Sequence, residues 1–168
     1  MQKRIKILGV PFDAIDLSEV ITWIEKKIRE DGKIHIATPN PEMVLEAQKN
    51  NILKRILEKT HLNIPDGTGI ILASKGKIKS RITGTDLMEK IIIKSSKSDS
   101  PLFQKKIFLL GAGEKIAEKV QKKFSEKLNV IKIIGIESGS PMPEDEERLI
   151  QKINGSGAEI LFVAYGSP

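Results

Sequence analysis

The hydrophobic residues of this chain follow two patterns that take turns along its length. In short stretches the apolar residues alternate with polar ones or follow one another directly, which is typical of β-strands. Between these stretches they recur every three or four positions, as on the buried face of an amphipathic helix. The predicted strands are residues 4–8, 34–37, 61–64, 106–110, 130–134 and 159–164, and the predicted helices are residues 17–30, 41–47, 52–57, 70–73, 87–92, 114–128 and 144–153.

Strands that alternate with helices of this length predict an α/β fold, in which a mostly parallel, Rossmann-like sheet is covered by helices on both faces. Residues 9–13 contain glycine and proline and are predicted to turn, which gives a small strand-turn element at the N-terminus. The polar residues 95–101 are the best candidate for a subdivision. Because 168 residues is a usual size for one domain, we expect a single domain over residues 1–168.

Composition narrows the class of function. The net charge of +6 comes from 28 basic and 22 acidic residues that are interspersed rather than gathered in blocks, and few aromatic residues are available to stack on bases. We therefore expect no nucleic-acid partner, although a mild attraction to anionic ligands or an anionic membrane surface remains. The chain has no cysteine, no apolar run of the ~18 to 20 residues that a membrane span needs and no signal-peptide pattern, so we expect a cytoplasmic protein.

A single carboxylate stands where one predicted strand ends. Asp66 follows residues 61–64 and is surrounded by turn-forming residues, because Pro65 cannot extend a strand ladder and Gly67 lets the backbone approach a ligand closely. An α/β enzyme would place a general base at such a position. The same residues also suit an ordinary Pro-Asp-Gly turn, in which the aspartate bonds its own backbone. Taken alone, the segment favours the second interpretation.

Other polar or glycine-containing segments follow predicted strands on the same side of the sheet. In an open parallel sheet, the ligand crevice lies outside the carboxyl ends of the strands. Residues 38–40, 65–69, 111–113 and 165–168 all fall at this end. Thr38 and Asn40 can be explained as the end of a strand and the cap of a helix, or as a hydroxyl and an amide that orient a sugar or a diphosphate.

Several residues could contact phosphate. Gly111 and Gly113 lie between a strand and a helix, where their backbone amides could hold a phosphate or where glycine simply allows tight packing. Ile116 stands where the dinucleotide fingerprint needs its third glycine, so NAD-dependent chemistry is disfavoured. Arg81 could stay at the surface or reach a phosphate, and Asp86 is most simply a favourable charge at a helix start. The sequence has no Asp-x-Asp pair to hold a metal on a nucleotide sugar, so a leaving phosphate would need cationic side chains and backbone amides.

Five short motifs are spread over nearly the whole chain. They are Thr38-Pro39-Asn40-Pro41, Pro65-Asp66-Gly67-Thr68-Gly69, Arg81-x-x-Gly84-x-Asp86, Ile107-Phe108-Leu109-Leu110-Gly111 and Ala164-Tyr165-Gly166-Ser167-Pro168. Read together, they resemble the WecG/TagA/CpsF glycosyltransferase family, and within it the N-acetylmannosaminyltransferases of wall teichoic acid synthesis. The resemblance implies inverting transfer of N-acetylmannosamine from UDP-N-acetylmannosamine to the C4 hydroxyl of N-acetylglucosaminyl-diphospho-undecaprenol, without a metal and without a cofactor.

The resemblance also implies roles for individual residues. Asp66 would be the base that accepts the proton of the acceptor hydroxyl, a contribution worth about 10²- to 10⁴-fold in rate. The substrate-binding residues predicted in this way are Thr38, Asn40, Gly67, Arg81, Gly84, Asp86, Gly111 and Gly113. The family continues beyond the position of Pro168 into a basic segment. We therefore expect an impaired catalyst that lacks this C-terminal segment, and a full-length protein peripheral to the inner face of the cell membrane.

The expected partners are the UDP-sugar donor and the lipid-linked acceptor, and a homo-oligomer is left open. Two other classes of function also stay open. A nucleotide-sugar binding module without catalytic activity would bind UDP but transfer nothing. A basic scaffold protein would not bind UDP at all.

Overall fold

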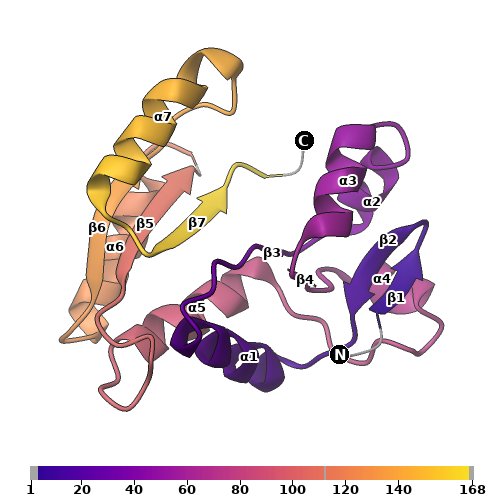
Figure 1. Cartoon of the computed structure of the whole chain (residues 1–168), viewed down its shortest axis with the longest axis horizontal. Coiled ribbons are helices and arrows are strands. Elements are labelled where there is room, and N and C mark those ends of the chain that lie inside the picture. The colour runs from indigo at the N-terminus through magenta and orange to yellow at the C-terminus, as the bar shows by residue number, and fades with distance from the viewer. Residues whose placement is uncertain (1–3, 112, 167–168) are drawn as a thin grey trace. The chain divides into compact units, whose positions relative to one another are not determined.

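The computed structural model describes residues 4–111 and 113–166, and it divides the chain into two compact units. The first unit contains the described residues up to Lys90, and the second contains Ile91–Gly166. The division falls inside helix α5 (Gly84–Ser95), shortly before the polar residues 95–101 at which a subdivision is predicted. The single domain expected from the sequence over residues 1–168 stays a prediction. Figure 1 shows the elements of both units.

The first unit begins with a β-hairpin and continues with short helices and strands. After β1 (Arg4–Ile7) and β2 (Val10–Asp13), its elements are α1 (Leu17–Arg29), β3 (Ile36–Ala37), α2 (Pro41–Glu46), α3 (Asn51–Lys59), β4 (Leu62–Asn63), α4 (Thr68–Ala73) and the start of α5. Strands β3 and β4 pair in parallel, with Ile36 opposite Leu62 and Ala37 opposite Asn63.

The turn predicted at residues 9–13 is wrong, because most of these residues form β2. The chain reverses in two residues, Leu8 and Gly9, whose φ angles of 48° and 83° suit a tight hairpin turn. Val10 then pairs with Ile7 in an antiparallel register. Pro11 is tolerated in this strand because the sheet that the described residues form here has two strands, so each strand has an edge where a missing N–H breaks no ladder.

A compact apolar cluster stabilises the first unit. It joins the hairpin to the helices that follow, and its buried members are Ile7, Val10, Phe12, Val44, Ala47, Leu57, Ile70 and Ile78. Helix starts in this unit follow the sequence signals. At α1, the Asp16 carboxylate accepts from the backbone N–H of Glu19, and the Glu19 carboxylate accepts from that of Asp16, both at 2.9 Å.

The second unit is built on a three-stranded parallel sheet. Its elements are β5 (Lys106–Gly111), α6 (Ile116–Lys127), β6 (Lys132–Glu137), α7 (Pro143–Ser156) and β7 (Ile160–Ala164), and the strand order is β6-β5-β7. On β5, Phe108 and Leu110 pack against Leu149 of α7. Because side chains alternate along a strand, Ile107 and Leu109 point to the other face, and Figure 1 shows α6 on the side of the sheet opposite α7.

The α/β fold predicted from the sequence is therefore confirmed, with a Rossmann-like parallel sheet covered by helices on both faces in the second unit. The small N-terminal element is also present, as a hairpin rather than as a strand and a turn. Within the described part of the chain, no helix is both long enough and apolar enough to cross a bilayer.

Candidate active site

Two of the predicted site segments leave the same edge of the β3–β4 pair. Residues 38–40 follow β3 and residues 65–69 follow β4, and the two strands run in parallel. In the second unit, Gly111 is the last residue of β5, Gly113 lies two residues further along the chain, and Tyr165 follows β7, which is the parallel neighbour of β5. The predicted placement of these segments at carboxyl ends of strands is confirmed within each unit. Ala112, Ser167 and Pro168 lie outside the described residues.

Backbone hydrogen bonds join three segments of the first unit. The amide of Asp66 donates to the carbonyl oxygen of Pro39 at 3.2 Å, directly beyond the last paired residues of the two strands. The amide of Ile82 donates to the carbonyl oxygen of Pro65 at 3.1 Å. We call residues 38–41, 65–69 and 81–86, which these bonds hold side by side, the loop cluster.

Close approaches to glycine complete the loop cluster. A Cβ atom on Gly69 would lie 2.8 Å from Cγ of Pro41, and one on Gly67 would lie 3.2 Å from Cδ of the same ring. Gly67 also has a φ of 94°, which disfavours any side chain there. A Cβ on Gly84 would lie 3.1 Å from the Thr38 hydroxyl oxygen. The glycines of these motifs therefore allow the segments to pack together, whatever else they contact.

Asp66 lies in this cluster with its carboxylate unengaged. The residue is partly exposed, and its side chain has no hydrogen bond or ion pair with any residue that the structure describes. Among the described residues, the Asp66 carboxylate accepts no hydrogen bond from the backbone of its own turn. An aspartate in an ordinary Pro-Asp-Gly turn would accept one. A carboxylate that is reachable from solvent and free of partners can accept a proton from a bound hydroxyl. Its catalytic role stays a prediction.

The other predicted residues of the first unit differ in how free they are. The Asn40 side chain caps α2 by accepting from the amide of Met43 at 2.8 Å. The Thr38 hydroxyl is half-buried and has no hydrogen-bond partner among the described residues. Thr38 is therefore the better placed of the two for binding a substrate.

Asp86 caps helix α5 together with Thr83. Its carboxylate accepts from the Thr83 amide at 3.3 Å, and its own amide donates to the Thr83 hydroxyl at 3.0 Å. Hydrogen bonds from the side chain and the backbone of Thr83 lower the pKa of the Asp86 carboxyl, and the exposed Arg81 guanidinium lowers it further. The helix-start explanation thus accounts for Asp86, while Arg81 presents its cation at the surface of the loop cluster.

A buried polar network, which the sequence did not reveal, supports the strand that leads to Asp66. The Arg4 guanidinium donates to both oxygens of the Asp13 carboxylate at 3.1 Å, and that carboxylate accepts from the Asn63 amide at 2.8 Å. The Asn63 side chain donates to the carbonyl oxygens of Pro11 and Leu57, at 2.8 and 2.6 Å. Asp13 was predicted to lie in a turn, so no signal pointed to its pairing with β4. The network fixes β4 against the hairpin three residues before the candidate base.

In the second unit, Gly111 is explained by packing. Its φ is 92°, and a Cβ atom would lie 2.8 Å from Cδ1 of Tyr165 and 2.9 Å from the carbonyl carbon of Ala164. Gly113 is exposed, and among the described residues that are not its chain neighbours only Ile116 would lie within 4 Å of a Cβ there. Helix α6 begins at Ile116 rather than at residue 114. The phosphate contact expected at this turn stays a prediction.

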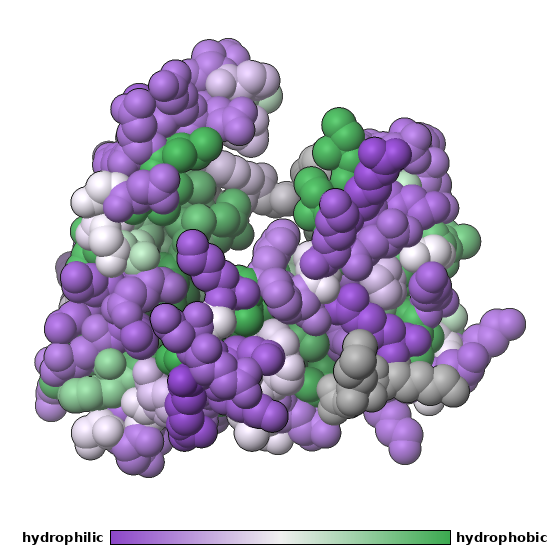
Figure 2. Space-filling model, viewed as in Figure 1, coloured by the Kyte–Doolittle hydropathy of each residue, from purple (hydrophilic) through white to green (hydrophobic). Residues whose placement is uncertain are grey.

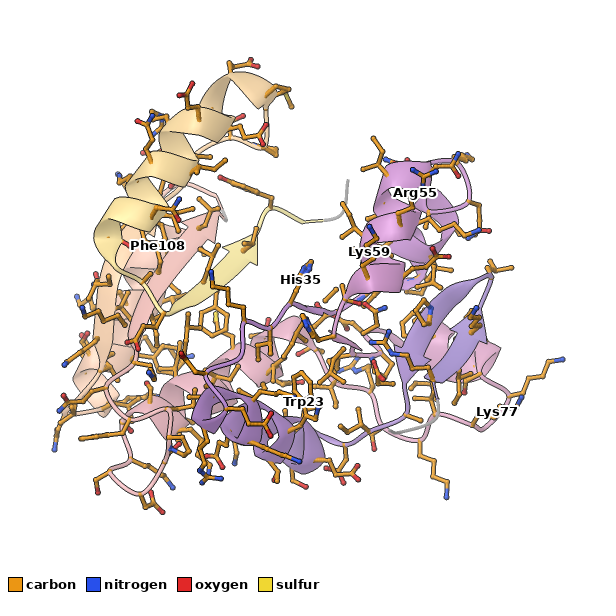
Figure 3. All side chains as sticks on the ribbon, in the orientation of Figure 1. Trp23, His35, Arg55, Lys59, Lys77 and Phe108 are labelled. Atoms are coloured by element: carbon orange, nitrogen blue, oxygen red, sulfur yellow. The ribbon has the colours of Figure 1, made fainter. Side chains whose placement is uncertain are left out.

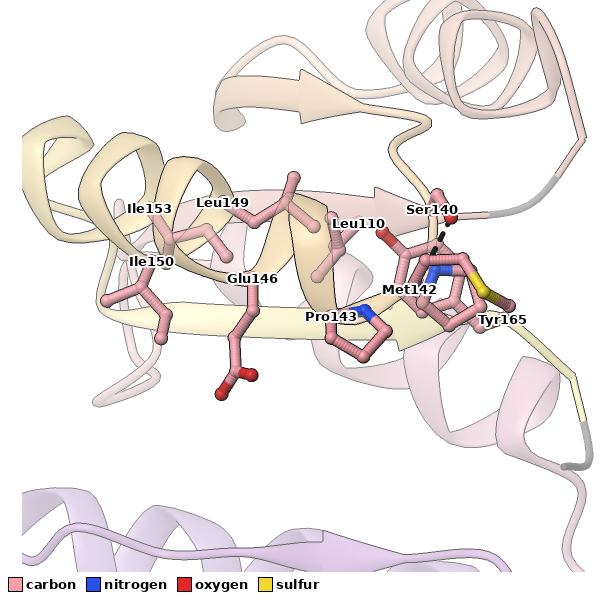
Figure 4. Close-up of a pocket in the computed structure, with 10 residues that line it drawn as sticks. Leu110, Ser140, Met142, Pro143, Glu146, Leu149, Ile150, Ile153 and Tyr165 are labelled. Carbon is pink, nitrogen blue, oxygen red and sulfur yellow. Dashed lines mark hydrogen bonds between the residues drawn. The ribbon is translucent and has the colours of Figure 1, made fainter.

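Tyr165, which lies close to Gly111, also lines a cavity of about 300 Å³. Figure 4 shows the Tyr165 ring beside Met142 and Ser140. The remainder of the cavity is lined mostly by apolar side chains of α7, together with Leu110 of β5, Pro141 and the acidic Glu146. The Tyr165 hydroxyl is buried and has no hydrogen-bond partner in the described part of the chain. Burial raises the pKa of this phenol, so it stays protonated at neutral pH. None of the predicted site residues lines this cavity, and the sequence analysis gave Tyr165 no role of its own beyond its place in the closing motif and in the segment 165–168.

No group of three or more histidine, aspartate or glutamate side chains within residues 4–111 and 113–166 is arranged to hold a metal ion. The metal independence implied by the family resemblance is not tested by this observation and stays a prediction.

Comparison with known proteins identifies the family to which this chain belongs. The family model described as "Glycosyl transferase WecG/TagA/CpsF family" matches residues 5–168, which is nearly the whole chain. The chain belongs to this family. The resemblance inferred from the five motifs is therefore confirmed, and glycosyltransferase activity is the activity of its family.

Two curated relatives carry a more specific name, N-acetylglucosaminyldiphosphoundecaprenol N-acetyl-beta-D-mannosaminyltransferase. The protein of Bacillus subtilis (strain 168) is 29% identical over 167 residues, which cover 96% of this chain and 62% of that protein. The protein of Bacillus spizizenii (strain ATCC 23059 / NRRL B-14472 / W23) is 28% identical over 157 residues, which cover 91% of this chain and 58% of that protein. The chain thus spans about three-fifths of the length of these relatives.

Proposed function

We propose that this chain transfers N-acetylmannosamine from UDP-N-acetylmannosamine to the C4 hydroxyl of N-acetylglucosaminyl-diphospho-undecaprenol, with inversion and without a metal ion. The names of the two relatives support this choice of sugar and of acceptor. The observation that carries the proposal is the Asp66 carboxylate, which is partly exposed, has no partner among the described residues, and lies in a loop cluster at the carboxyl edge of a parallel strand pair.

In the proposed reaction, Asp66 acts as the general base. Its carboxylate accepts the proton of the acceptor's C4 hydroxyl while the hydroxyl oxygen attacks C1 of the donor sugar. The bond from C1 to the β-phosphate oxygen breaks, and UDP leaves with the electron pair. Because the new bond forms on the face opposite the leaving group, the configuration at C1 inverts. A hydroxyl is a poor nucleophile until a positioned base accepts its proton, and this assistance is worth about 10²- to 10⁴-fold.

Neighbouring groups in the loop cluster would bind and orient the sugars. The Thr38 hydroxyl, which has no partner among the described residues, can donate and accept a hydrogen bond, and the exposed Arg81 guanidinium could neutralise charge on the leaving diphosphate with its planar set of N–H donors. Roles for Asn40, Gly67, Gly84 and Asp86 would be confined to shaping the cluster, because their side chains or their small size already serve its packing and capping.

The proposal is tested by calorimetric titration with UDP, followed by a transfer assay with UDP-N-acetylmannosamine and an N-acetylglucosaminyl-diphosphate lipid in the presence of EDTA. We expect UDP binding, formation of the disaccharide lipid and no loss of transfer in EDTA. Binding of UDP without any transfer would contradict the proposal and favour a nucleotide-sugar binding module. Absence of UDP binding would contradict both the transferase and the binding module, and it would favour a scaffold protein. UDP-N-acetylglucosamine, the epimeric donor, serves as the comparison for sugar specificity.

A further inference from the structure

The segment that joins α4 to α5 carries cations without acidic residues between them. Residues 67–85 contain Lys75, Lys77, Lys79 and Arg81 and no aspartate or glutamate, whereas basic and acidic residues are interspersed over most of the chain. All four side chains are exposed. The three lysines have no ion-pair partner among the residues that the structure describes. Their positive charge is therefore not neutralised within the described part of the chain.

Two buried isoleucines anchor this segment. Ile78 is 1% exposed and belongs to the apolar cluster of the first unit, and its amide donates to the Ser74 hydroxyl oxygen at 3.0 Å. Ile82 is 2% exposed, and its amide donates to the carbonyl oxygen of Pro65 at 3.1 Å. The backbone between the two isoleucines is therefore held in place at both ends.

Lys77 and Lys79 lie on the outward side of the anchored segment. Along residues 77–82, exposed side chains alternate with buried or half-buried ones, as they do in an extended chain. Figure 3 shows Lys77 reaching away from the ribbon, and Figure 2 shows hydrophilic side chains projecting on this side of the first unit. Two residues of extended backbone span about 6 to 7 Å, so the two ammonium groups can converge on one diphosphate. We call Lys77 and Lys79 the lysine pair.

The lysine pair is connected to the loop cluster by short steps. Arg81 is the next outward residue after Lys79, and the amide of Ile82, which follows it, is bonded to the carbonyl oxygen of Pro65. Asp66 is the next residue after Pro65. Along this path, Arg81 comes first after the candidate base and the lysine pair comes next.

We propose that the lysine pair binds the diphosphate of the acceptor. The proposal deepens the proposed function and rests on it, because it takes the C4 hydroxyl of the acceptor sugar to Asp66. In a pyranose ring C1 lies opposite C4, so the diphosphate on C1 would extend away from the base by the width of one sugar. An ammonium group has three N–H donors and a full positive charge, both of which suit phosphate oxygens.

Two diphosphates meet during the proposed transfer, one on the donor and one on the acceptor. Their like charges repel each other, so each needs cations of its own. Arg81, which comes first after Asp66, would serve the leaving diphosphate of the donor, and the lysine pair would serve the acceptor. The cations of this segment would thereby distinguish the two substrates.

The test is calorimetric titration with a soluble acceptor, an N-acetylglucosaminyl diphosphate that carries a short alkyl chain in place of undecaprenol. Neither donor nor bilayer is present, so the result depends on neither transfer nor membrane association. An exposed ion pair contributes up to about fivefold in affinity, so we expect the Kd for this compound to rise about tenfold in Lys77→Gln, Lys79→Gln. The variant Lys77→Arg, Lys79→Arg keeps both charges and should restore the Kd to within about threefold. The Kd for UDP should stay within about threefold in both variants, because the lysine pair would not contact the donor.

A matched control is available on α6. The variant Lys119→Gln, Lys123→Gln removes the same charge from two exposed lysines, and it should keep the Kd for the soluble acceptor to within about twofold. Equal losses in the two glutamine variants, or no loss in either, would overturn the proposal. So would binding of the soluble acceptor that is no tighter than binding of methyl N-acetylglucosaminide, which lacks the diphosphate. A rise in the Kd for UDP as large as that for the acceptor would assign the lysine pair to the donor, and it would also overturn the proposal.

Anionic headgroups carry the same phosphate chemistry, so vesicles of phosphatidylglycerol are tested beside the soluble acceptor. Loss of vesicle binding in Lys77→Gln, Lys79→Gln, with no change in the Kd for the soluble acceptor, would assign the pair to headgroups and overturn the proposal. Failure of the proposed function gives a different result. The soluble acceptor would still bind through the lysine pair, but no disaccharide would form when UDP-N-acetylmannosamine is added.

Discussion

The backbone amide of Asp66 donates a hydrogen bond to the carbonyl oxygen of Pro39 at 3.2 Å. This bond extends the parallel pairing of β3 and β4 by one step beyond the strands, into the turns that follow them. It places the partly exposed carboxylate of Asp66 in the same loop cluster as the hydroxyl of Thr38. Two motifs that lie far apart along the chain therefore become neighbours because the strands before them run in parallel.

Replacement of Asp13 by asparagine is expected to destabilise the protein by about 2 to 4 kcal/mol, because Arg4 then loses its ionic partner in a site where the Asp13 side chain is only 5% exposed. The measurement is urea denaturation. The control is Asp145→Asn, which breaks a more exposed pair with Arg148 and should reduce stability by less than about 1 kcal/mol. Similar losses in the two variants would show that the network around Asn63 does not hold the hairpin to β4.

Addition of one methyl group at Gly69 is expected to disturb the loop cluster. In Gly69→Ala the new Cβ would lie 2.8 Å from Cγ of Pro41, so the turn or the start of α2 must shift, with a loss of about 1 to 3 kcal/mol. The matched control is Gly155→Ala in α7, where no described residue outside the local helix backbone would lie within 4 Å of the new Cβ and the helix should gain up to about 1 kcal/mol. Thermal unfolding of both variants provides the comparison. A neutral Gly69→Ala would mean that the two turns are not packed together as described.

An acid-dependent contribution to stability is expected at Glu137. Its hydrogen bond from Lys152 lowers the pKa of the carboxyl, and the nearby charge of Arg148 lowers it further. Because the pKa is lower in the folded state, the stabilisation is present above the ordinary glutamate pKa and is lost as the pH falls through the folded value. The free energy of unfolding of the unsubstituted chain should therefore be higher than that of Glu137→Gln by up to about 1 kcal/mol at pH 7. This difference should shrink at pH 3. Denaturation curves at several pH values check this, and a difference that grows in acid would contradict it.

The local signals of the sequence predicted much of the fold. The Asp16 and Asn40 caps lie where predicted, because capping depends on neighbours within one turn. Strand β2 was missed because Pro11 argues against a strand unless the pairing partner is known, and that partner is β1. The boundaries of some elements also differ from the prediction, since β6 begins at Lys132 and not at residue 130.

The candidate site could be predicted only in part, because local signals do not reveal contacts between segments that are distant along the chain. The placement of residues 38–40 and 65–69 followed from the rule for parallel strands. The contact of Thr38 with Gly84 and the pairing of Asp13 with Asn63 join segments that are distant along the chain, and no spacing in the sequence encodes them. Tyr165 and its cavity depend on the packing of α7 against β5 and could not be read from a motif.

The central claim is tested most directly by the rate of sugar transfer in Asp66→Asn, measured beside UDP affinity in the same preparation. Asparagine keeps the size of the side chain but cannot accept the proton, so transfer should fall by at least about 100-fold while the Kd for UDP stays within about threefold. Asp99→Asn, which alters an exposed aspartate of the second unit, should leave both quantities unchanged. Transfer by Asp66→Asn at the rate of the unsubstituted chain would contradict the assignment of Asp66 as the base.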